Sequence, residues 1–458
     1  MAFATSISDV RSGAAAPALA PESPVVWPAR TVRTLANGLQ VVLVESHIIP
    51  KLSGQLLFRS GSAAAETPGL ADMTATTVRT GTASRTSRQI EEELRRLGAD
   101  LGSSAGADTS AISFSGLAEF SAELLALVND LARNASFPAA ELERERRHQI
   151  EALRIERTTP GFLAGERLRK VLFGSHPYAI VSPAEEQVAS YTREGLEGYY
   201  RAHYTPGNAL LVMAGDFSAG AMLTQIEKIF ADWRAPQPAA SSHPDPPLPQ
   251  GRRVHLVHLP GSVQTQILLG NHAITRKHPD WLRLTLANSI FGGAFNSRLV
   301  MNIREQKGYT YSPRSSAHPL RQHGWFSVGA AVRNDVVAAT LTEIFYEIDR
   351  MRALPVGDAE LADSRNYMSG VFSLGLATQS GLAGQLVNVY LNGLPEDYLE
   401  TYREKIRALT ADDVLTAARR YFDSANAQIA IVGDRAQIEE QAALFGPSTV
   451  YDAQGNAQ

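Results

Sequence analysis

The sequence contains no cysteine in its 458 residues. Disulfides and thiolate metal sites are therefore excluded, and any metal ligand would have to be His, Asp or Glu. A broad excess of positive charge is also missing, since the formal net charge is -4 at pH 7. Nucleic-acid backbones are held by basic surfaces, so this charge balance argues against a nucleic-acid partner.

Long apolar runs are absent as well, because no stretch approaches the roughly 18 to 20 residues that a membrane helix needs. The sequence therefore predicts a soluble protein with no membrane segment. Residues 1–28 are rich in Ala, Ser and Pro, and their AAAPALA stretch is similar to a signal-cleavage region without the preceding basic and apolar segments. We expect an extended N-terminal arm there, and its composition favours a periplasmic over a cytoplasmic location.

The length predicts two domains, because single hydrophobic cores stop growing near about 250 to 300 residues. A stretch with six prolines and no apolar periodicity, APQPAASSHPDPPLPQG, divides the chain near its middle. Such a composition is typical of a stiff interdomain linker. We therefore expect an arm, a first domain, a linker, a second domain and a tail, at residues 1–28, 29–234, 235–251, 252–446 and 447–458.

The two predicted domains repeat one another. The first carries YTPGNALLVMAGD at 204–216, the second carries FDSANAQIAIVGD at 422–434, and four positions match at a constant offset of 218 residues. Both domains also start a charged helical stretch after a Phe-Pro or Leu-Pro pair, at 137–142 and 354–361. This self-similarity indicates an internal duplication.

Each half has the same succession of patterns. Alternating strands are expected at 39–44 and 254–259, and a helix is expected where apolar residues recur at three-and-four spacing, at Leu341, Ile344, Phe345, Ile348 and Met351. The predicted fold class is therefore α+β, with two homologous domains that each have a mostly antiparallel sheet with helices packed on it.

A search for catalytic motifs finds no unaided hydrolytic site. His255 and His258 lie three apart in a predicted strand and point to opposite faces, so they cannot share an ion. Glu145, His148 and Glu151 share one helix face, but arginines surround them, and the pattern is typical of a solvated helix surface. Whether a vestigial metal site exists there stays open. Nucleophile elbows and phosphate-binding glycine loops are also missing.

Both halves contain short segments that together form a recognisable pattern: LANGLQVVLV at 35–44, RSGS at 59–62, PGLA at 68–71, TGT at 80–82, FNSRL at 295–299 and IREQKGYTYS at 303–312. With these segments the chain resembles the pitrilysin-type inverse-zinc metallopeptidases, a family that includes insulysin, the mitochondrial processing peptidase and the core proteins of the cytochrome bc1 complex. The resemblance covers residues 32 to 446. Duplicated halves joined by a linker are how that family is built.

Catalytic members of that family place the motif His-x-x-Glu-His between the PGLA and TGT segments. In this chain Asp72 and Thr76 stand at the two ligand positions, and Ala75 stands at the general-base position. A downstream carboxylate such as Glu145 or Glu151 could stand near the third ligand, but one carboxylate does not retain Zn²⁺ without its imidazoles. The resemblance therefore implies a chain without metal or cofactor of its own.

The second half keeps a different part of the family pattern. Arg304 and Tyr311 match the Arg and Tyr with which the family binds the substrate beside the zinc. Both side chains carry hydrogen-bond donors, which can stabilise the oxyanion that forms when water attacks the scissile carbonyl. The alternative is an Arg in a surface ion pair with Glu305 and a packed Tyr. Arg298 is expected to be structural or interfacial.

Together these observations predict a zinc-free subunit, inactive alone, that pairs with a homologous zinc-bearing chain carrying His-x-x-Glu-His. Arg304 and Tyr311 would serve the partner's zinc site, and an extended peptide substrate would add to a sheet edge in a chamber between the two chains. A purely structural core-type subunit and a peptide-binding protein without catalytic role are the alternatives.

Overall fold

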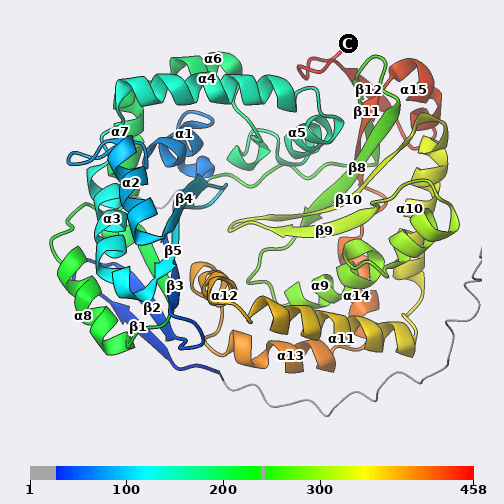
Figure 1. Cartoon of the computed structure of the whole chain (residues 1–458). Coiled ribbons are helices and arrows are strands. Elements are labelled where there is room, and N and C mark those ends of the chain that lie inside the picture. The colour runs from blue at the N-terminus through cyan, green and yellow to red at the C-terminus, as the bar shows by residue number, and fades with distance from the viewer. Residues whose placement is uncertain (1–26, 239–242) are drawn as a thin grey trace, which may run out of the picture.

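The computed structural model describes residues 27–238 and 243–458, and each half of the chain builds one six-stranded sheet (Figure 1). The first sheet has the strand order β1-β2-β6-β3-β5-β4, and the second has the order β12-β7-β11-β8-β10-β9. The strands of the first sheet are β1 (Arg30–Thr34), β2 (Gln40–Glu45), β3 (Lys51–Phe58), β4 (Asp100–Ala105), β5 (Ser110–Leu117) and β6 (Ala209–Gly215). Those of the second are β7 (Arg253–His258), β8 (Gln264–Ala273), β9 (Arg314–Pro319), β10 (Gly324–Arg333), β11 (Gln428–Gly433) and β12 (Ser448–Tyr451).

The two sheets confirm the duplication read from the sequence. The repeated segments form β6 and β11, and each runs parallel to one neighbour, β2 or β7, and antiparallel to the other, β3 or β8. The remaining pairs that the sheets share, β3 with β5, β5 with β4, β8 with β10 and β10 with β9, are all antiparallel. The predicted α+β class with mostly antiparallel sheets is confirmed.

The sixth strand comes from a different part of the chain in each sheet. β1 is the first strand of its domain and pairs antiparallel with β2, whereas β12 is the last strand of the chain and pairs parallel with β7. The segment 447–458, expected to be a tail, therefore contributes an edge strand, and the second sheet extends past residue 446. β12 has only four residues, which is too short for an alternating apolar pattern to predict a strand.

The two halves together form a ring-like outline in Figure 1, and the helices lie mainly around its outside. In the first half they are α1 (Leu70–Thr77), α2 (Ser87–Leu97), α3 (Ser121–Asn134), α4 (Ala139–Glu156), α5 (Pro160–Phe173), α6 (Glu185–Ser190), α7 (Arg193–His203) and α8 (Ala219–Phe230). In the second they are α9 (Trp281–Asn288), α10 (Val337–Ala353), α11 (Asp358–Gly375), α12 (Gln379–Asn392), α13 (Tyr398–Ala408), α14 (Ala411–Tyr421) and α15 (Arg435–Ala443). The predicted apolar stripe lies on α10, and all five of its residues are buried.

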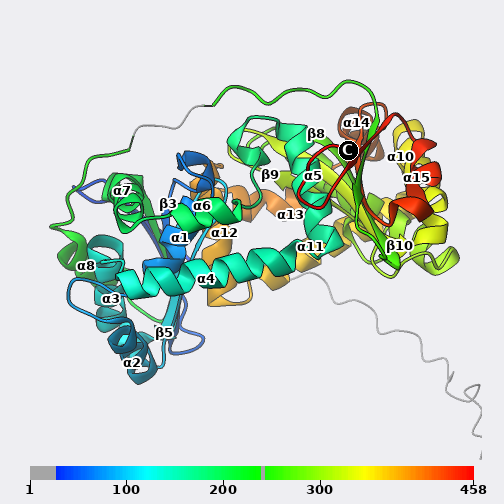
Figure 2. The same ribbon diagram turned by 90° about the horizontal axis from the view of Figure 1, so that it is seen from above.

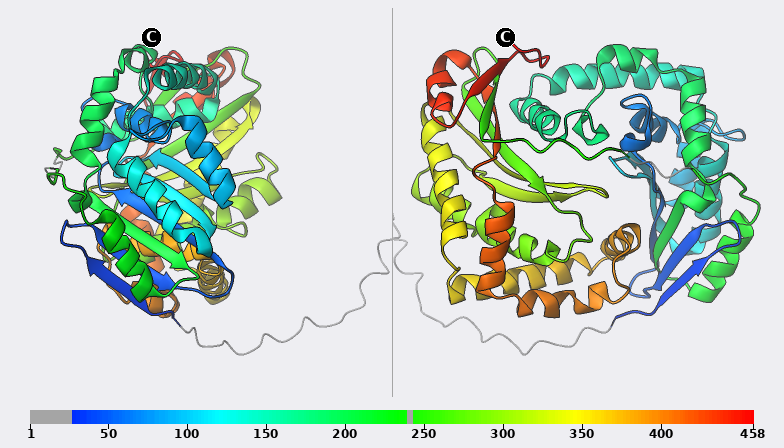
Figure 3. Two further views of the ribbon diagram at one scale, coloured as in Figure 1. Left: turned by 60° about the vertical axis from the view of Figure 1, so that its left-hand side comes forward. Right: turned by 180° about the vertical axis from the view of Figure 1, so that it is seen from behind.

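One helix from each half packs on the sheet of the other half. α5 follows the long helix α4 across to the second sheet, where Leu168 lies in one apolar cluster with Ala430 and Val432 of β11 (Figure 2). In return α12 packs on β3 and β6, and its Leu386 lies in one cluster with Val212. In the view from behind in Figure 3, the segment with α4 and α5 and the segment with α12 join the two halves on opposite sides of the molecule. The halves are therefore interlocked.

Parts of the predicted domain plan lie outside the described residues. These are residues 1–26 of the arm, with the periplasmic prediction that rests on them, and residues 239–242 of the linker. The described linker residues, 235–238 and 243–251, form neither helix nor strand. Within the described part of the chain, no helix is both long and apolar enough to cross a membrane.

Candidate active-site residues

Arg304 lies in a π-helical segment between α9 and β9. This segment, η7 (Val300–Gln306), turns Ile303 into the core, where it is fully buried, and leaves Arg304 on the other side, partly exposed. π-Helical turns are rare and are found frequently at functional sites. The local geometry thus separates the core-forming residue from the candidate residue that follows it.

The structure brings Arg304 and Tyr311 together. The Arg304 Nη1 atom donates to the backbone carbonyl of Tyr311 at 3.4 Å, and the guanidinium lies 4.9 Å from the ring centroid of Phe295. Its Nε atom is 3.1 Å from Glu305 Oε1. The contact expected for a purely structural Arg304 is therefore present, and the Arg304 contact to Tyr311 runs through the carbonyl instead of the hydroxyl.

The ring beside Arg304 and the side chain of Tyr311 are both exposed. Tyr311 is 87% exposed and Phe295 is 70% exposed. Large apolar side chains gathered at a surface are typical of an interaction site. Phe295 is the residue that the sequence analysis missed as a neighbour of Arg304, although it opens the quoted FNSRL segment.

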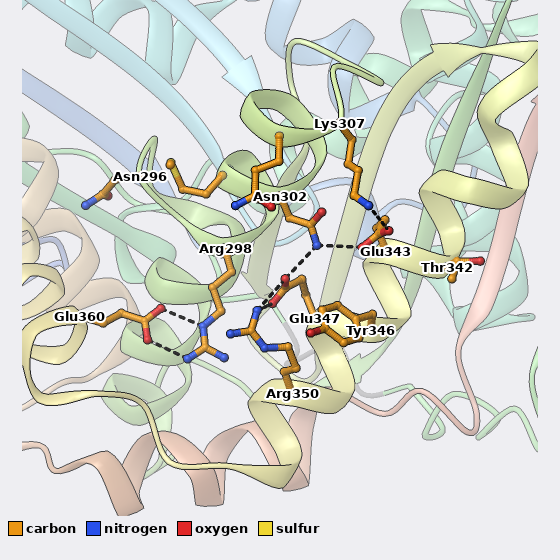
Figure 4. Close-up of a pocket in the computed structure, with 12 residues that line it drawn as sticks. Asn296, Arg298, Asn302, Lys307, Thr342, Glu343, Tyr346, Glu347, Arg350 and Glu360 are labelled. Atoms are coloured by element: carbon orange, nitrogen blue, oxygen red, sulfur yellow. Dashed lines mark hydrogen bonds and ion pairs between the residues drawn. The ribbon is translucent and has the colours of Figure 1, made fainter.

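Arg298 lines a pocket of about 580 Å³ next to α10, and neither Arg304 nor Tyr311 belongs to the lining of this pocket (Figure 4). Its guanidinium donates two hydrogen bonds, of 2.8 and 2.7 Å, to the carboxylate of Glu360. The other charged side chains of this pocket are also paired, as Lys307 with Glu343 and Arg350 with Glu347. Bidentate pairing of this kind fits the structural role expected for Arg298.

The positions that the resemblance aligns with the zinc motif lie on α1. Asp72, Ala75 and Thr76 are spaced so that they share a helix face, as metal ligands and a base would need to. Ala75 is fully buried and Thr76 is exposed. Gly69 precedes the helix with φ of 77°, and an added Cβ atom would lie 2.3 Å from the Tyr191 hydroxyl. The glycine of the PGLA segment is therefore required by the backbone conformation and by packing against Tyr191.

The carboxylates of α4 do not complete an ion site beside α1. His148 Nδ1 lies 3.8 Å from Glu145 Oε2, Glu145 is also paired with Arg144 at 3.0 Å, and Glu151 is exposed. Among residues 27–238 and 243–458, no three His, Cys, Asp or Glu side chains lie where they could hold a metal ion. The residues at the motif positions, one carboxyl, one methyl and one hydroxyl, do not fit zinc.

Asp72 has an unusual electrostatic environment. Burial raises the pKa of its carboxyl group to about 6, and its own backbone N–H only partly offsets this rise. The carboxyl also contributes, after burial, to the raised pKa of Tyr191.

Asp72→Asn should therefore stabilise the fold at neutral and alkaline pH. Because the pKa of Asp72 is raised in the folded state to about 6, wild-type stability is lost as pH rises through that value. Since the side chain is partly exposed, we expect a gain of about 1 to 2 kcal/mol at pH 8 and little change at pH 4. Urea unfolding at both pH values measures it. An equal effect at the two pH values would show that the charge of Asp72 is not responsible.

Residues 40–159 match the profile of the insulinase family, peptidase family M16, and residues 190–368 match the profile described as the peptidase M16 inactive domain. An uncharacterized zinc protease of Bacillus subtilis, YmxG, is 24% identical over 85% of this chain and 95% of its own length. A zinc protease of Rickettsia felis is 23% identical over 88% and 97%.

Solved structures share the fold over nearly the whole described chain. The peptidase M16 inactive domain from Pseudomonas fluorescens superposes with a TM-score of 0.84 at 26% identity, over 89% of this chain and 98% of that one. A protease from Helicobacter pylori gives 0.83 at 20% identity, over 89% and 100%.

Proposed function

The chain belongs to peptidase family M16, in its non-catalytic type, and we propose that it is the zinc-free subunit of a heteromeric zinc metallopeptidase. The observation that carries the proposal is an intact fold with an altered motif. Helix α1 is fully formed, yet it holds Asp72, Ala75 and Thr76 where zinc ligands and a base would stand. The second half still presents Arg304 and Tyr311 at an exposed surface.

In the proposed complex the zinc-bearing partner supplies the activated water. The contribution of this chain is to hold an extended peptide and to place two donors, the Arg304 guanidinium and the Tyr311 hydroxyl, at the scissile carbonyl. Donors fixed in advance stabilise the developing oxyanion more than the ground state. The exposed Tyr311 side chain leaves its hydroxyl available to a substrate.

The ion pair with Glu305 favours the alternative of a structural subunit in which Arg304 has no chemical role. The strength of this ion pair decides between a structural and a catalytic role for Arg304. Both side chains are partly exposed, and such pairs contribute about 0 to 1 kcal/mol. Redirecting Arg304 from Glu305 to a substrate would therefore cost little, so the pair does not argue strongly against catalysis.

Mixed with a homologous chain that carries His-x-x-Glu-His, this chain should form a stable one-to-one complex at micromolar concentration. The exposed Phe295, Met301 and Tyr311 provide apolar surface for such an interface, which needs about 1,200 to 2,000 Å² in total. Sedimentation of the mixture and of each chain measures the association. Separate species at micromolar concentration, with the zinc-bearing chain fully active alone, would favour the structural or peptide-binding alternatives.

A further inference from the structure

A second pocket, of about 480 Å³, lies where the two halves meet. Its walls come from the β4–β5 turn of the first sheet, the β9–β10 turn of the second, the start of α9 and one face of α12. The two turns approach each other in the centre of Figure 1, and the backbone N–H of Arg321 donates to Asp108 Oδ2 at 2.8 Å across them. The pocket therefore exists only when the halves are joined.

Arg276 is the distinctive residue of this pocket. Its guanidinium carbon lies 4.9 Å from the ring centroid of Trp281 and 5.6 Å from that of Tyr398, and both rings are buried. In the part of the chain that the structure describes, Arg276 forms no ion pair with an acidic residue. A guanidinium held between rings is pre-organised, so little side-chain entropy is lost when it binds.

The one carboxylate of the pocket is already engaged. Asp108 accepts hydrogen bonds from the Tyr178 hydroxyl and from the Arg321 backbone. A second arginine, Arg321, also lines the pocket, and its Nη1 atom donates to the backbone carbonyl of Arg59 at 3.1 Å. Positive charge thus exceeds negative charge around the pocket, and a ligand that enters it should be anionic.

Neutral donors complete the lining. Gln385, Asn388 and Asn392 are spaced three and four residues apart, on one face of α12. The Trp281 Nε1 atom is buried and has no acceptor among the described residues. Trp281 itself is only 6% exposed, so an unsatisfied donor is built into the wall.

We propose that this pocket binds a carboxylate of an extended peptide, either the C-terminal carboxylate or an Asp or Glu side chain. The planar guanidinium of Arg276 matches a carboxylate in a bidentate pair, and the amides of α12 can donate to the remaining lone pairs. The peptide as ligand class rests on the proposed function, and the pocket adds a preference for one negatively charged group.

The test uses the isolated full-length chain and three acetylated ten-residue peptides of Ala, Ser and Gly. One has a free C-terminal carboxylate, one has a C-terminal amide, and one has the amide with a central Glu. By calorimetry, at least one carboxylate-bearing peptide should bind about tenfold more tightly than the neutral amide, as a charge-assisted hydrogen bond predicts. The peptide that gains affinity identifies the source of the carboxylate. Equal binding of all three, or no binding at about 1 mM, overturns the proposal.

Arg276→Gln should remove the preference for a carboxylate, and Arg276→Lys should restore it in part. The matched control is Arg252→Gln, because Arg252 is also partly buried and stacked on a ring, Phe345 at 4.4 Å, but lies outside the pocket. If Arg276→Gln fails to fold, Asn388→Asp places a negative charge at an exposed position of the lining and should also abolish the preference. Persistence of the preference in a folded Arg276→Gln or Asn388→Asp chain contradicts the proposal.

These binding measurements need no partner chain, so they separate the two hypotheses. If the chain prefers carboxylate peptides but never supports hydrolysis, the carboxylate-binding proposal is supported and the proposed catalytic role is contradicted. If the complex hydrolyses peptides but the chain alone shows no preference, the catalytic role is supported and the carboxylate-binding proposal is contradicted.

Discussion

Tyr311→Phe should lower kcat of the heteromeric complex by about 10² to 10³, in line with the loss of one oxyanion donor, while the subunits stay paired. The substitution keeps the ring and removes only the hydroxyl. Since Tyr311 is 87% exposed and its hydroxyl forms no hydrogen bond within the described residues, folding should be unaffected. Steady-state hydrolysis of an unstructured peptide, with sedimentation of the same samples, measures both effects.

Arg304→Ala should do comparable or greater harm, because it removes a charge as well as a donor. Arg304→Lys should rescue only part of the activity, since an ammonium group cannot reproduce the planar fork. The control is Arg298→Ala, which breaks the bidentate pair with Glu360 and should disturb stability or pairing first. If Tyr311→Phe and Arg304→Ala both leave hydrolysis within about threefold of wild type, the pair is not catalytic and the subunit is structural.

Much of the fold could be predicted because the two halves repeat each other. The segments 204–216 and 422–434 became equivalent strands, β6 and β11, and the apolar spacing of α10 identified its buried face. The crossing of α5 to the second sheet could not be predicted. Apolar spacing can indicate which face of a helix is buried, but it does not say that Leu168 packs near β11 of the other half.

Part of the candidate site could be predicted because its two residues lie in one short segment. Arg304 and Tyr311 are seven residues apart in one segment, and the structure joins them by a hydrogen bond. Their exposed neighbour Phe295 gave no signal, because an aromatic residue in a short segment is usually buried. The pocket around Arg276 was missed because its walls come from four separated segments, and only the shared face of α12 is visible in the sequence.

The most direct test of the proposed role is to measure zinc content and peptide hydrolysis for this chain alone, for the zinc-bearing chain alone and for their mixture. We expect no stoichiometric zinc and no turnover for this chain, since Asp72, Ala75 and Thr76 replace two ligands and a base. Addition to the partner should raise hydrolysis until about one chain per partner is present, because only then does each zinc site meet Arg304 and Tyr311. About one tightly held zinc per isolated chain with chelator-sensitive turnover, or a partner whose activity does not change on mixing, would contradict the account.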